Sequence, residues 1–75
     1  MHQKNIKELR ALTDRNQFWV SARTGIDRTR LSLIECGHVV ATPEEQATLE
    51  KVLLAEIDRR AQEFRAVVSG ASLVD

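Results

Sequence analysis

The stretch Gln17–Cys36, QFWVSARTGIDRTRLSLIEC, decides the fold. It predicts two short helices, over residues 17–24 and 28–36, joined by a tight turn at Gly25. Apolar residues recur at a spacing that lets the two helices close on each other, at Val20, Leu31 and Ile34. The second helix opens with polar residues that can reach outward, Asp27, Arg28, Thr29 and Arg30. A short helix with a polar N-terminal face, supported by a second helix, has the shape that a DNA major groove admits.

The size of the chain disfavours an enzyme. Its 75 residues make at most one domain, and a chain this short buries only roughly 60% of its unfolded surface. A deep substrate pocket is hard to frame at this size, so we expect no catalytic residues, no cofactor and no metal site. One cysteine favours a reducing compartment such as the cytoplasm, and the lack of a signal peptide or long apolar run disfavours secretion and membrane insertion.

The charges are unevenly distributed although their sum is zero. Residues 1–38 hold seven basic and four acidic side chains, which gives +3, whereas residues 39–75 hold four basic and seven acidic ones, which gives −3. This asymmetry fits a first half that faces a polyanion. Ordinary scatter in a short chain explains it equally well.

Helix signals flank the central pair. Asn5 followed by Glu8 resembles a capping box and predicts a first helix over residues 6–13. Thr42-Pro43-Glu44-Glu45 predicts the start of a long helix, which continues to about Val68 before a flexible end from residue 69. This segment forms either one helix of about 26 residues or two shorter ones with a bend. The sequence therefore predicts an all-α fold with four or five helices.

A combined motif points to a known family. Asn16-Gln17 opens the first helix of the pair, Gly25 lies at the turn, and Glu35-x-Gly37 closes the second helix behind Leu31 and Ile34. From about Ile6 to Leu54 the chain resembles the helix-turn-helix domains of the lambdoid phage repressor and Cro family, often called the Xre family. The chain departs from the family's preferences at Ser21, where a small alanine is usual, and at Thr24, where an apolar residue is usual.

The resemblance implies a DNA-binding surface on residues 1–54. The start of the 17–24 helix would lie against a phosphate, and base edges would be reached by Arg28, Thr29, Ser32 and Leu33. Asp27 would either accept a hydrogen bond from cytosine N4 or cap its helix. The residues assigned to DNA contact are Asn16, Gln17, Arg23, Asp27, Arg28, Thr29, Arg30, Ser32, Leu33 and His38. The alternative for the arginines, with Arg15 among them, is a solvated basic face.

Two further expectations concern packing. Arg10 stands where the family often places a basic residue that pairs with the glutamate matching Glu35, so we expect a structural ion pair between them. Phe18 and Trp19 are adjacent, and one helix cannot bury both on a single stripe. One ring should therefore be core and the other partly exposed.

Residues 55–75 extend beyond the resembling domain, and Ile57, Ala61, Phe64 and Val68 form an apolar stripe there. We expect this stripe to pack against a second copy in a homodimer, or else to fold back on its own domain. The resemblance implies a dimeric, sequence-specific regulator of transcription that binds double-stranded DNA. It would act in a bacterial cytoplasm as a repressor of the phage or mobile-element kind. The alternative is a protein-interaction module, similar to an antitoxin or an anti-activator, that uses the helix-turn-helix as a scaffold.

Overall fold

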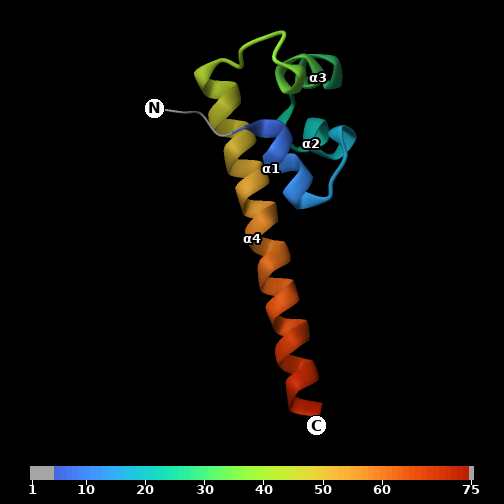
Figure 1. The fold of residues 1–75 in the computed structure, drawn as a ribbon. Helices are drawn as coiled ribbons and strands as arrows, with labels where there is room; N and C mark the ends of the chain where they lie inside the picture. Colours follow the sequence, from blue (N-terminus) through green and yellow to red (C-terminus); the bar gives the residue numbers. More distant parts are fainter. Residues whose placement is uncertain (1–4, 75) are drawn as a thin grey trace.

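The fold is all-helical, as the sequence predicts, in the computed structural model described here. The backbone is described from residue 5 to residue 74 and the side chains from residue 5 to residue 69. The described part comprises α1 (Ile6–Thr13), α2 (Gln17–Thr24), α3 (Arg28–Cys36) and α4 (Pro43–Val74). Figure 1 shows α1, α2 and α3 gathered around one end of α4, while the other end of α4 extends away from them.

Each helix begins at a residue whose side chain satisfies a backbone N–H of the first turn. Asn5 accepts from the Glu8 N–H at 3.1 Å, and Asn16 accepts from the Trp19 N–H at 2.9 Å. At the start of α4, Thr42 Oγ1 accepts from the Glu45 N–H, and the Glu45 carboxylate accepts from the Thr42 N–H. These are the caps that the sequence predicts, and they set the helix starts locally.

The three short helices end in the left-handed conformation. Gly25 and Gly37 have φ values of +76° and +82°, which only glycine adopts without a steric penalty. Asp14 ends α1 at φ +57°, and a short polar side chain tolerates this conformation better than a branched one. The predicted ends of the short helices are therefore confirmed.

A small core joins the four helices. It consists of Ile6, Val20, Ile26, Leu31, Leu49 and Leu53, with Leu9 and Trp19 packed against its edge. Leu12 follows Ile6 and Leu9 at helical spacing along α1, but it does not join this core and is 66% exposed. Leu12 lies at the last turn of α1, beside the part of α4 that has left the core.

The long helix runs further than predicted. The sequence predicted an end near Val68 and a flexible segment from residue 69, whereas α4 continues without a break to Val74. Gly70 is the only helix-breaking residue in that segment and costs only about 1 kcal/mol relative to alanine. The boundary predicted between residues 54 and 55 lies inside this helix. No helix in the described range is long and apolar enough to span a membrane.

A buried carboxylate connects α1, α2 and α3. Glu35 on α3 accepts from Arg10 Nε at 2.7 Å and from Arg10 Nη2 at 2.9 Å, and it also accepts from Gln17 Nε2 at 3.2 Å. Arg10 Nη1 donates in addition to the Arg15 carbonyl at 3.0 Å. The Glu35 side chain is only 4% exposed, so these bonds replace water that the carboxylate has lost.

A second polar contact joins the α1–α2 connection to α4. Arg15 Nε donates to Glu56 Oε2 at 2.9 Å, and Arg59 also binds Glu56, one turn further along α4. Hydrogen bonds from Arg59 and then Arg15 lower the pKa of Glu56 from its ordinary value of 4.5 to about 2. The carboxylate therefore stays ionised. Among the described residues, Glu56 is the last on α4 that forms an ion pair with the rest of the domain.

Replacing Glu35 with alanine should destabilise the fold strongly. The Arg10 guanidinium would lose both partner oxygens while remaining largely shielded from water, which costs about 3 kcal/mol. For a domain of this size we expect the melting temperature to fall by more than about 10 °C. Thermal unfolding followed by circular dichroism measures the change. The matched control is Glu44→Ala on the exposed first turn of α4, and a similar melting temperature for both variants would contradict the role of Glu35.

Replacing Glu56 with glutamine should change how stability depends on pH. The folded-state pKa of Glu56 is below its ordinary value, so the carboxylate stabilises the fold above pH 4.5, and this contribution is lost as the pH falls towards 2. The difference in melting temperature between the parent and Glu56→Gln should be largest near neutral pH and shrink in acid. The exposed Glu44→Gln variant should show no such trend. A difference that does not vary with pH would refute the assignment.

Candidate nucleic-acid interface

The α2–turn–α3 unit is held by side-chain contacts to its own backbone. Thr24 Oγ1 donates to the Val20 carbonyl at 2.9 Å and accepts from the Ile26 N–H at 3.2 Å. Ser21 Oγ donates to the Ile26 carbonyl at 2.6 Å. Ser21 and Thr24 are two of the positions at which the chain departs from the preferences of the resembling family; Leu33 and the loop after Gly37, which lacks the usual basic residues, are others. Both hydroxyls bind the turn, so the turn is compatible with polar residues there.

One surface hollow brings together five of the residues that the sequence assigned to DNA contact. It is lined by Gln17, Arg28, Thr29, Ser32 and Leu33. Gln17 comes from the first turn of α2, and the other four come from one face of α3. Leu33 remains 38% exposed at the edge of this surface. The hollow combines an amide, a guanidinium, two hydroxyls and an apolar side chain, which are groups that contact base edges and phosphates.

Three of the assigned residues have structural partners that limit their part in binding. Asn16 and Asp27 serve as N-caps, and the Asp27 carboxylate accepts from the Thr29 N–H at 2.9 Å. Of the two interpretations of Asp27, the structure displays the cap. The Gln17 side chain also has a partner inside the protein, because its amide donates to buried Glu35. Its backbone N–H still belongs to the first turn of α2, where the helix dipole favours an anion.

Arg30 lies in an ion pair. Arg30 Nε and Nη2 donate to the two oxygens of Glu45 at 2.5 and 2.8 Å, which ties α3 to the start of α4. Hydrogen bonds from Arg30 and from the Thr42 N–H lower the pKa of Glu45 to about 2, so the acidic partner is ionised at neutral pH. Arg30 does not line the hollow, and its charge is compensated. The sequence did not reveal this pair because Arg30 and Glu45 are far apart along the chain.

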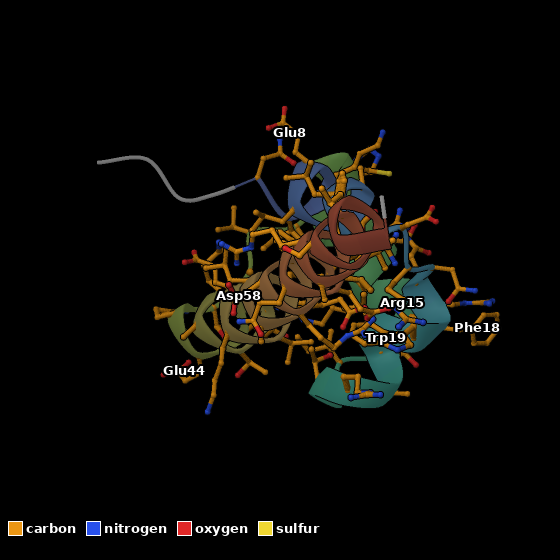
Figure 2. All side chains as sticks on the ribbon, turned by 90° about the horizontal axis from the view of Figure 1, so that it is seen from below. Glu8, Arg15, Phe18, Trp19, Glu44 and Asp58 are labelled. Atoms are coloured by element: carbon orange, nitrogen blue, oxygen red, sulfur yellow. The ribbon has the colours of Figure 1, made fainter. Side chains whose placement is uncertain are left out.

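The adjacent residues Phe18 and Trp19 lie in different environments, as expected for neighbours on one helix. Trp19 packs against the core, and the guanidinium carbons of Arg15 and Arg23 lie 4.9 and 4.7 Å from its ring centroid. Phe18 is 63% exposed, and Arg28 lies over its ring at 3.9 Å. Figure 2 shows Phe18 pointing outward while Trp19 lies beside Arg15. Phe18 is therefore a neighbour of the hollow that sequence reasoning did not assign to it.

Arg23 and His38 lie apart from the hollow. Arg23 stacks on Trp19 and lines a different hollow, between α2 and α4, together with Lys51 and Arg59. His38 is exposed after the end of α3, and its backbone N–H donates to the Leu33 carbonyl at 3.0 Å. Among the described side chains, no three His, Cys, Asp or Glu residues gather in a group that could hold a metal ion.

The predicted dimer residues share one exposed region of α4. Ile57 is half-buried at the edge of the domain, Ala61 is exposed, and Phe64 and Val68 are 59% and 49% exposed. The stripe does not fold back on its own domain, because α4 continues straight past it (Figure 1). Of the two possibilities left by the sequence, the fold-back is wrong for the described residues.

Comparisons with known proteins found no relative of this chain. No protein-family model, no curated protein and no solved structure matches the chain.

Proposed function

We propose that the protein is a sequence-specific double-stranded DNA-binding regulator of transcription that acts as a repressor. The single observation that carries this proposal is the hollow lined by Gln17 and by one face of α3. The α3 helix is short, its N-terminal half is polar, and α2 and the core support it from behind. This arrangement fits insertion of α3 into a major groove with the start of α2 against the phosphate backbone.

Arg28 is the residue on which sequence discrimination would depend most. Its guanidinium can donate two parallel hydrogen bonds to guanine O6 and N7, a pairing worth about 1–3 kcal/mol. The Phe18 ring beneath it restricts where the guanidinium can lie. Thr29, Ser32 and Leu33 would contact neighbouring bases, with Leu33 against a thymine methyl group. Repression would follow from occupying an operator and excluding polymerase.

A protein-interaction module is the second candidate, and a specific observation favours it. Phe18 and Leu33 are both exposed apolar side chains beside the hollow, and the ion pairs of Arg15 and Arg30 reduce the positive charge available to a polyanion. An exposed apolar patch with a polar rim is typical of a protein contact. In that case the same surface binds a toxin or another regulator.

Titration with duplex DNA distinguishes the two candidates. The probe is the DNA upstream of the protein's own gene, titrated with the full chain at several salt concentrations. For the DNA-binding function we expect saturable binding whose logarithm falls linearly with the logarithm of salt concentration. Arg28→Ala should weaken binding to the specific duplex by about tenfold or more. Lys51→Ala removes the same charge from exposed α4 and serves as the control. Absence of binding, with Arg28→Ala indistinguishable from the parent, would favour the protein-interaction module.

Releasing Arg30 from Glu45 should strengthen binding that does not depend on sequence. Glu45→Gln removes the compensating charge but keeps a side-chain acceptor for the Thr42 N–H, so the start of α4 should remain capped. We expect tighter binding to random-sequence duplex and a salt slope steeper by about one unit. In Glu45→Gln/Arg30→Ala the gain should disappear. An unchanged salt slope in the single variant would show that Arg30 lies too far from the phosphates.

A further inference from the structure

The outer half of α4 carries an apolar groove that the protein's own domain leaves open. We define the outer stripe as Ile57, Ala61, Phe64 and Val68, which follow one another at intervals of four, three and four residues. The groove beside it is completed by Leu12 at the end of α1 and by Val67, which are 66% and 71% exposed. Intervals of four and three place the stripe at alternating d and a positions of a heptad, the pattern of a helix that packs against another helix.

We propose that this groove binds the same helix of a second copy in antiparallel orientation, with the two-fold axis passing between residues 62 and 63. In this register Ala61 faces Phe64 of the second copy, and Ile57 faces its Val68. Each layer then contains one smaller and one larger side chain, which fills the space between two helices evenly. A parallel pair would instead place Ala61 against Ala61 and Phe64 against Phe64.

The charged residues beside the outer stripe also favour the antiparallel orientation. In the antiparallel register Asp58 lies opposite Arg65 of the second copy, and the two-fold symmetry creates this attractive pair twice. In a parallel pair Arg60 would lie beside Arg65 of the other chain, which is repulsive. Asp58 is on the side of α4 that faces away from Arg15 and Trp19, so the domain does not cover it (Figure 2).

The position of the domain on α4 also favours the antiparallel pair. The helices α1, α2 and α3 are all at one end of α4 (Figure 1). Leu12 at the end of α1 lines the same groove as Ile57, the first residue of the outer stripe. Parallel helices would bring two whole domains to the same end, on the face where α1 lies. In the antiparallel pair each domain meets only the outer end of the other helix, and Leu12 would contact Val67 of the second copy.

This inference rests on the proposed DNA-binding function where it concerns DNA, and it specifies how two such surfaces would be spaced. Leu49 of α4 and Leu31 of α3 belong to the same core cluster. At 1.5 Å per residue, the two Leu49 positions would be about 40 Å apart along the paired helices. Successive major grooves on one face of DNA are about 34–36 Å apart. The two copies of α3 would therefore lie at a separation of the order that two half-sites require.

The oligomeric state of the full chain tests the groove without DNA. Sedimentation equilibrium should give a dimer whose dissociation depends on concentration. Phe64→Glu places a charge in the central layer and should give a monomer that retains its helical circular dichroism and cooperative melting. Ala66→Glu adds the same charge two residues further along, outside the stripe, and should remain dimeric. A monomeric parent, or equal dissociation of the two variants, would overturn the proposal.

Disulfide formation tests the orientation. Because exposed Cys36 would also react, every variant carries Cys36→Ser. Asp58→Cys/Arg65→Cys should form a linked dimer on mild oxidation, whereas Arg60→Cys/Arg65→Cys should not. Within one helix both pairs are too far apart along the axis to be bridged, so any disulfide is between chains. Linking only by the second pair would establish a parallel dimer and overturn the proposal.

Charge reversal provides an independent check in the parent sequence. Arg65→Glu should weaken an antiparallel dimer, because it sets a second carboxylate against Asp58, and adding Asp58→Arg should restore the dimer. In a parallel dimer Arg65→Glu would strengthen association by removing the repulsion from Arg60. Since none of these measurements uses DNA, a protein that dimerises in this way but binds no duplex would refute the DNA-binding function alone.

Discussion

The arrangement of the domain depends on the buried carboxylate of Glu35. Its side chain is almost inaccessible to water, and it receives hydrogen bonds from Arg10 on α1 and from Gln17 on α2. A carboxylate that loses water without such partners is strongly unfavourable, so α1 and α2 must both meet α3 at this point. The orientation of α3 relative to the start of α2 follows from this requirement. That orientation creates the hollow at Gln17 and Arg28 on which the proposed function depends.

The charge distribution has a structural consequence as well as a functional one. Two arginines of the basic first half pair with glutamates of the acidic second half, Arg15 with Glu56 and Arg30 with Glu45. The asymmetry seen in the sequence is thus partly used to attach the α1–α2 connection and α3 to α4. A DNA complex of this protein would owe less to overall electrostatic attraction and more to the direct contacts of Arg28 and its neighbours.

The helix α4 is longer than the core can cover, and its outer part would form the proposed dimer. This helix has 32 residues, and about its first half packs against the core, through Leu49 and Leu53. A helix gains most of its stability in a protein from packing of its apolar face, and beyond the half-buried Ile57 the outer stripe is exposed within one chain. A second copy would supply this packing. The same contact would hold two α3 helices at a fixed distance from each other, which a monomer cannot do.

Local sequence determined where the helices begin and where the three short helices end. The caps at Asn5, Asn16 and Thr42, and the turns at Gly25 and Gly37, involve residues within a few positions of one another, so their hydrogen bonds follow from sequence spacing. The resemblance to a family suggested the pairing of Arg10 with Glu35, and spacing alone did not.

Only the tertiary structure decided which distant side chains meet. It paired Arg30 with Glu45, placed Arg28 over Phe18, and left Leu12 exposed at the groove on α4. Apolar periodicity identifies a face of a helix but not where its neighbour stops, because that depends on how helices distant in sequence are placed in space. The continuation of α4 to Val74 also does not follow from periodicity. It depends on the small free-energy cost of a glycine within a helix, at Gly70, which apolar spacing does not measure.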